Sequence, residues 1–75
     1  MSVLLRVSGR EVVAALAKLG YEKDRQKGSH IVLRQVMHPH RRLVVPDHKE
    51  IARGTLRAII KQAGFTVEEF NALFK

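Results

Sequence analysis

The segment RQKGSHIVLR, residues 25–34, joins a polar run, a glycine turn and a run of apolar residues. Lys27-Gly28 marks a turn, because glycine adopts backbone conformations that other residues avoid. The SHIVLRQ that follows contains three consecutive apolar residues with β-branched character and predicts a strand. The polar residues 21–26 before the turn are compatible with an exposed first strand. The segment therefore predicts two strands joined by a tight connection.

Side-chain alternation divides the second of these strands between two faces. Ile31 and Leu33 fall on one face, whereas His30, Val32 and Arg34 fall on the other. We expect Ile31 and Leu33 to lie in the core. His30 is then expected on the open face of the sheet or at its edge, in line with Arg34.

A third strand is expected after a hairpin loop. VMHPHRR, residues 36–42, contains Pro39 and predicts the loop. RLVVP, residues 42–46, predicts the strand, which ends at Pro46 because proline lacks the N–H of a ladder bond. Three short strands with tight connections indicate an antiparallel meander.

The first helix is signalled before the strands. VSGREVV places Ser8 at an N-cap and Glu11 three residues later, which is a capping box. Apolar residues recur at helical spacing after this box, and Gly20 follows as a C-terminal signal. We therefore expect a helix over residues 9–19.

A second helix follows the strands after a loop, DHKEIARG, at residues 47–54. TLRAIIKQAG reads as helical, with Gly54 or Thr55 as its cap and Gly64 as its stop. Its apolar residues share one face and are expected in the core: Leu56, Ile59, Ile60 and Ala63.

A second capping box, Thr66 with Glu69, predicts a short last helix that runs to about Phe74. The expected fold is α+β, in the order helix, three strands, helix and short helix, with one domain over residues 1–75. The sheet would pack its apolar face on the helices and leave its other face open.

Charge is the most informative part of the composition. The 75 residues include fourteen Lys and Arg against seven Asp and Glu, a net charge of +7. The segment from Lys23 to Lys61 alone carries +7, with ten basic and three acidic residues, and it holds all four histidines. Concentrated positive charge in a small domain favours a polyanion, most often nucleic acid. The alternative is a soluble basic surface with no nucleic-acid role.

Several classes of site and location are excluded or disfavoured. The absence of cysteine excludes disulfides, thiolate catalysis and cysteine zinc sites, and fits a cytoplasmic protein. The longest fully apolar run, Val12 to Ala17, is too short to cross a membrane. A chain of this size has no room for a large cofactor pocket. We expect no cofactor, no small-molecule partner and no membrane association.

Four segments resemble, in order, those of the HicA-type toxins, also described as YcfA-like proteins: VSGREVVAALAKLGY, RQKGSHIVLR, RLVVPDH and RGTLRAIIKQAGFTVEEF. The resemblance extends over residues 7–74. Its most specific elements are the triplets Gly28-Ser29-His30 and Gly54-Thr55-Leu56, each weak alone but specific together at this spacing.

The resemblance implies a fold like the double-stranded RNA-binding domain and a type II toxin–antitoxin system. It implies a ribosome-independent endoribonuclease, an mRNA interferase, that a HicB-type antitoxin neutralises. The catalytic residue implied is His30. A proline-X-histidine element of the family matches Pro46-Asp47-His48. Asp47 departs from the basic residues frequent at its position and would place a negative charge near the RNA path.

The residue types around His30 suit RNA cleavage. RNA supplies its own nucleophile, the 2′-hydroxyl, and a histidine, which titrates at about pH 6.5 in water, can accept its proton. General base catalysis of this kind contributes roughly 10²–10⁴-fold in rate. Cations such as Lys27 and Arg34 would stabilise the developing charge without a metal ion. Gly28 would allow close approach of a phosphate, and Ser29 would steady the turn.

The other basic residues and histidines each allow two interpretations, a functional one and a solvent-exposed one. The residues expected to bind RNA are Lys27, Gly28, Ser29, Arg34, Arg41, Arg42, Lys49 and Arg53; the alternative is a charged, solvated surface. His48 is a secondary candidate for catalysis or phosphate binding, or else an exposed loop residue. His38 and His40 flank Pro39, and two ligands without a third make an incomplete metal site. For the whole chain, the alternatives to a nuclease are a noncatalytic double-stranded RNA-binding module and a basic protein that binds only a protein partner.

Overall fold

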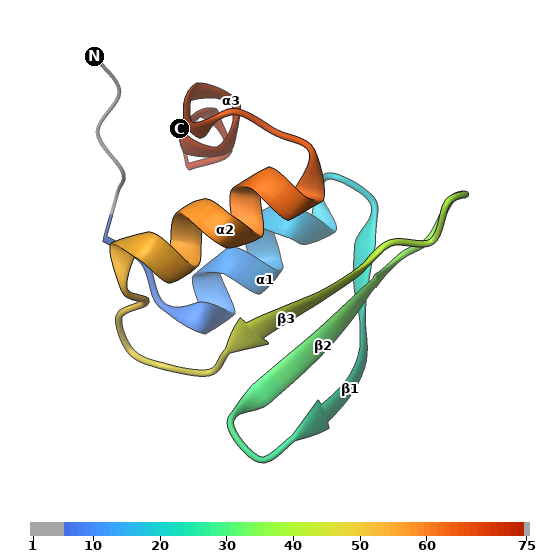
Figure 1. The fold of residues 1–75 in the computed structure, drawn as a ribbon, viewed down its shortest axis with the longest axis horizontal. Coiled ribbons are helices and arrows are strands. Elements are labelled where there is room, and N and C mark those ends of the chain that lie inside the picture. The colour runs from blue at the N-terminus through green and yellow to red at the C-terminus, as the bar shows by residue number, and fades with distance from the viewer. Residues whose placement is uncertain (1–5, 75) are drawn as a thin grey trace.

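A three-stranded antiparallel sheet with helices packed on one face forms the structure, a computed structural model that describes residues 6–74 (Figure 1). The elements are α1 (Gly9–Ala17), β1 (Tyr21–Lys27), β2 (His30–Gln35), β3 (Arg42–Pro46), α2 (Arg53–Ala63) and α3 (Val67–Ala72). The strands neighbour one another in chain order, with β2 in the centre. The predicted α+β order and the antiparallel meander are confirmed. Within residues 6–74, no helix is long and apolar enough to cross a membrane.

The register between β2 and β3 decides which side chains approach one another closely. Directly opposite pairs are His30 with Pro46, Val32 with Val44, and Arg34 with Arg42. Just outside them, Gln35 N–H donates to Arg41 O at 2.8 Å and Asp47 N–H donates to Ser29 O at 2.6 Å. Bonded and non-bonded pairs alternate in an antiparallel ladder, so the three pairs are the non-bonded, closely spaced kind. Pro46, which has no N–H, fits such a position.

The core lies between the sheet and the helices, as the strand alternation predicts. Ile31 and Leu33 are 4% and 0% exposed, and Leu43 and Val45 of β3 are buried with them. The predicted face of α2 is buried in full: Leu56, Ile59, Ile60 and Ala63. His30 and Arg34 are exposed on the opposite face of the sheet. One face of the sheet is therefore committed to the core and the other is left open.

The predicted capping box begins α1. Ser8 Oγ accepts from Glu11 N–H at 3.1 Å, and Ser8 N–H donates to Glu11 Oε1 at 2.9 Å. The helix ends at Ala17, two residues before its predicted end. After Ala17 the backbone forms hydrogen bonds of the 3₁₀ type, between residues three apart, such as Leu19 N–H to Leu16 O at 2.9 Å. The chain then turns into β1.

The start of α2 differs from the prediction. Its N-cap is Ala52, with no side-chain cap bond, and Gly54 lies inside the helix with Thr55. The predicted cap role for Gly54 or Thr55 is therefore wrong. The chain is fixed one residue earlier instead, because Ile51 is buried and its N–H donates to Val7 O at 2.9 Å. Tertiary contacts thus replace a local cap.

The end of α2 and the start of α3 follow the sequence signals. Gly64 ends α2 in the left-handed conformation, at φ 87°. Thr66 and Glu69 form the second capping box, with Glu69 N–H donating to Thr66 Oγ1 at 3.1 Å. The helix ends at Ala72, and the two described residues after it form a turn rather than the helical end that the sequence predicts.

Candidate nucleic-acid interface and catalytic turn

The turn between β1 and β2 places His30 at the end of the sheet. Lys27 pairs directly with His30, so Gly28 and Ser29 form a two-residue hairpin loop. Gly28 has φ 60°, a left-handed value at the first central position, which is where a type II′ turn takes glycine. A side chain at Gly28 would strain this backbone. The glycine therefore makes the reversal that sets Lys27 beside His30.

The His30 side chain is available to a ligand. It is exposed and makes no hydrogen bond or ion pair with any residue between 6 and 74. It shares the open face of the sheet with Lys27 on one side and with Pro46 on the other. The structure therefore leaves the His30 imidazole accessible from solvent.

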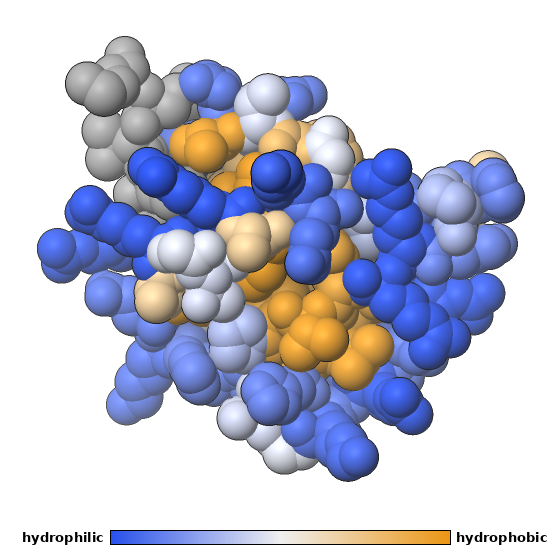
Figure 2. Space-filling model, in the orientation of Figure 1, coloured by the Kyte–Doolittle hydropathy of each residue, from blue (hydrophilic) through white to orange (hydrophobic). Residues whose placement is uncertain are grey.

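The open face carries more positive than negative charge. Three rows cross the sheet: Lys27, His30 and Pro46; then Arg25, Val32 and Val44; then Glu22, Arg34 and Arg42. Val44 is 50% exposed, so the middle of this face is partly apolar. Figure 2 shows hydrophilic residues around most of the molecule and an apolar area in the region of β3 and α2.

Two cations on this face oppose each other directly. Arg34 and Arg42 form a cross-strand pair, and neither has an ion-pair partner among residues 6–74. Like charges directly opposite on a sheet are destabilising. Glu22, opposite Arg34 on β1, offsets part of that repulsion, and a bound anion over the two guanidinium groups would offset the rest.

The basic residues of the open face lie at different distances from His30. Lys27 lies opposite His30, whereas Arg34 is four residues further along the strand. At about 3.3 Å per residue, this separation is roughly 13 Å between Cα atoms. Lys27 therefore lies beside His30, whereas Arg34 is too far along the strand to reach the same bound group as His30.

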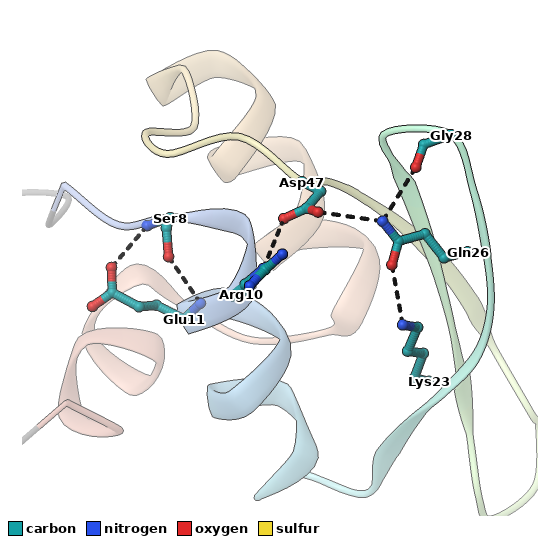
Figure 3. Close-up of polar contacts among 7 residues, drawn as sticks. All are labelled: Ser8, Arg10, Glu11, Lys23, Gln26, Gly28 and Asp47. Atoms are coloured by element: carbon teal, nitrogen blue, oxygen red, sulfur yellow. Dashed lines mark hydrogen bonds and ion pairs between the residues drawn. The ribbon is translucent and has the colours of Figure 1, made fainter.

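The Asp47 side chain is held by residues of two elements, α1 and β1, on the helix-facing side of the sheet (Figure 3). Its Oδ1 accepts from Arg10 Nε of α1 at 3.3 Å, and its Oδ2 accepts from Gln26 Nε2 of β1 at 3.2 Å. Gln26 Nε2 also donates to Gly28 O at 3.2 Å, and Gln26 Oε1 accepts from Lys23 Nζ at 3.0 Å. Both oxygens of the carboxylate are thus engaged away from the open face. This role of Gln26 was not predicted, because the sequence contains no local signal for it.

A comparison with protein families finds a match over residues 9–65 to the family described as the HicA toxin of bacterial toxin–antitoxin systems. The chain belongs to the HicA toxin family. No match is found among curated proteins. The HicA match runs from α1 to just past α2 and takes in the whole sheet, His30 and the loop that carries His48. Membership implies an antitoxin partner.

The HicA chain does not bring all its predicted RNA-binding residues to one face. Arg41 turns to the helix side, where its Nη1 donates to Gln62 O at 3.4 Å near the C-terminal end of α2. Arg53 is the first residue of α2, and Lys49 lies in the loop before it; both are exposed. Of Arg41, Arg42, Lys49 and Arg53, only Arg42 shares the open face with His30.

His48 lies two residues beyond Pro46, the strand partner of His30. Its carbonyl accepts from Gly9 N–H at 2.9 Å, which ties the loop to the start of α1. A side chain at Gly9 would collide with the Pro46 carbonyl, so this glycine permits the close approach. The His48 ring is exposed beside an open pocket of about 390 Å³ that Ser8, Arg10, Asp47 and Lys49 also line.

The hairpin tip holds the His38 and His40 pair. The rings meet edge to face, with centroids 6.3 Å apart. His40 Nδ1 lies 3.1 Å from Gln35 O, so this nitrogen donates to the carbonyl. In the part of the chain that the structure describes, no cluster of three or more His, Cys, Asp or Glu could hold a metal ion. The pair thus lacks the third protein ligand of a metal site.

Proposed function

We propose that this HicA toxin is a metal-independent endoribonuclease that cleaves mRNA without the ribosome, with His30 as its catalytic residue. The observation that carries the proposal is the exposed, unpartnered His30 at a tight glycine turn, directly opposite Lys27 on a cationic sheet face. Family membership supports a toxin, and the site supports a reaction on a phosphate chain.

The proposed reaction uses the nucleophile that RNA provides. The His30 imidazole removes the proton of a 2′-hydroxyl, and this oxygen bonds to the adjacent phosphorus. The bond between phosphorus and the 5′-oxygen breaks, and that oxygen takes a proton. The products are a 2′,3′-cyclic phosphate and a 5′-hydroxyl. Lys27 stabilises the charge that develops on the phosphate, and His48 is the candidate to protonate the leaving oxygen or to bind a phosphate.

The remaining contacts position the RNA. The backbone of Gly28 and Ser29 lies beside the reacting phosphate, and Arg34 with Arg42 binds the chain further along the open face. Lys49 and Arg53 extend the positive surface around the loop before α2. The Arg41 guanidinium lies on the helix side, beside Gln62 O, and adds positive charge there rather than on the open face.

A HicB-type antitoxin would neutralise the toxin by covering the His30 face. The core of this small domain is formed by hydrophobic side chains, and no charged residue is buried among residues 6–74. The open face instead offers cations around the half-exposed Val44. An acidic or aromatic surface of the antitoxin fits this combination, and it would block RNA and His30 together.

A direct test incubates the purified protein with mRNA in the absence of ribosomes, with and without a chelator. The proposal expects cleavage that the chelator does not change and products with 2′,3′-cyclic phosphate ends. Cleavage that needs a divalent ion, or none at all, would contradict it. The fold also supports a second candidate, a noncatalytic module for double-stranded RNA, which gel shifts with duplex RNA and the absence of cleavage would favour.

A further inference from the structure

We infer that Asp47 and Gln26 are positioning residues that hold the His30 turn from the helix-facing side of the sheet. The inference rests on the proposed function, since it assigns the two residues a task in RNA cleavage. Neither residue touches the RNA in this scheme. They act through the backbone of residues 28 and 29.

The hydrogen bonds reach the turn from two directions. Asp47 N–H donates to Ser29 O at 2.6 Å, and Gln26 Nε2 donates to Gly28 O at 3.2 Å. The same Gln26 amide donates to Asp47 Oδ2 at 3.2 Å. Both central carbonyls of the hairpin loop are therefore tied to a network that includes Asp47. His30 is the next residue, so the network sets where its Cα lies.

The network leaves the open face free. Gln26 pairs with Ile31, and opposite residues of a ladder project to the same face, so Gln26 lies on the side of the buried Ile31. Gln26 also lines a pocket with Arg10 and Val13 of α1. Lys27 and His30 project the other way. Asp47 thus supports the turn without competing with RNA for His30.

A network of this kind is useful because the turn is otherwise weakly supported. Residues 22–30 are all exposed, so packing does not fix the end of the hairpin. A small displacement of a catalytic group has a large effect on rate: about 1 Å can cost roughly 10²-fold. The acidic residue that departs from the family pattern therefore has a structural role, and its charge is balanced by Arg10 at 3.3 Å.

The test measures kcat and KM for RNA cleavage in the variants Gln26→Ala, Asp47→Ala, the double variant and Asp47→Asn. We expect each alanine variant to lower kcat by about tenfold or more, by loss of orientation. The double variant should be no slower than the worse single one, because the Asp47 carboxylate acts on the turn through the Gln26 side chain. Asp47→Asn keeps an acceptor oxygen for Gln26 and should restore most of kcat.

KM separates positioning from electrostatics. Removing a negative charge near the RNA path would by itself tighten binding, so the charge effect of Asp47→Ala is a lower KM. A fall in kcat with an unchanged or lower KM is the signature of lost positioning. The matched control is Arg10→Ala. The Arg10 side chain is 84% exposed, and its removal takes away the partner of Asp47 Oδ1 but keeps the bond from Gln26 to Asp47 Oδ2. The kcat of this variant should stay close to that of the wild type.

Different results would overturn the positioning role and the proposed function. If His30→Ala abolishes cleavage but Gln26→Ala and Asp47→Ala cleave like the wild type, the positioning role is overturned and the proposed function stands. If His30→Ala still cleaves, the proposed function falls and this inference falls with it. A kcat for Asp47→Asn as low as that for Asp47→Ala would overturn the role of the acceptor oxygen.

Discussion

Replacing His30 with alanine separates chemistry from folding more cleanly than any other change in this protein. The side chain is exposed, lies opposite Lys27 and Pro46, and makes no polar contact within residues 6–74. The change therefore leaves no cavity and no unsatisfied buried partner. We expect the free energy of unfolding to change by no more than about 1 kcal/mol, as for ordinary surface substitutions.

The effect on activity should be far larger. Loss of a general base lowers a cleavage rate by about two to four orders of magnitude. The variant should still bind RNA, because Lys27, Arg34 and Arg42 remain on the open face. Thermal melting, RNA binding and cleavage of a labelled mRNA are measured on the same preparation, together with growth after induction in cells.

The result that refutes this reasoning is cleavage by His30→Ala at the wild-type rate. Loss of cleavage together with a collapsed melting transition would instead show a structural histidine, which conflicts with its exposure. The matched control is His38→Ala, which removes another exposed histidine at the tip of the other hairpin, away from the His30 turn. It should melt and bind RNA like the His30 variant, and it should keep more of the cleavage activity.

Three further predictions concern binding and stability. RNA affinity should fall as salt rises, with a log–log slope of about −3 or steeper for single strands if roughly four cations each contribute about 0.7; a slope near zero in titrations would exclude electrostatic binding. Arg34→Glu should weaken both RNA binding and the antitoxin complex, and a complex of unchanged affinity would move the antitoxin interface elsewhere. Leu33→Ala, at a fully buried position, should cost about 2–5 kcal/mol in denaturant unfolding, and a loss under 1 kcal/mol would contradict the core described above.

Local sequence patterns predicted most of the fold, because the contacts that produce them are only a few residues apart. The capping boxes at Ser8 and Thr66 each join groups three residues apart, and both form. The period-two pattern of β2 placed Ile31 and Leu33 in the core and His30 on the open face. The catalytic role of His30 remains a prediction, since a location shows access and not chemistry.

The tertiary structure alone decided which polar residues of separate elements meet. Asp47 lies 21 residues from Gln26 and 37 from Arg10. The pairing of the strands brings Gln26 to Asp47, and the packing of α1 on the sheet brings Arg10 there. The same holds for Arg41, which the sequence grouped with Arg42 but which turns to Gln62 on the helix side. Propensities and alternation report which face a residue occupies along its own strand or helix. They do not report how separate elements are set against each other, which depends on the packing of the whole core.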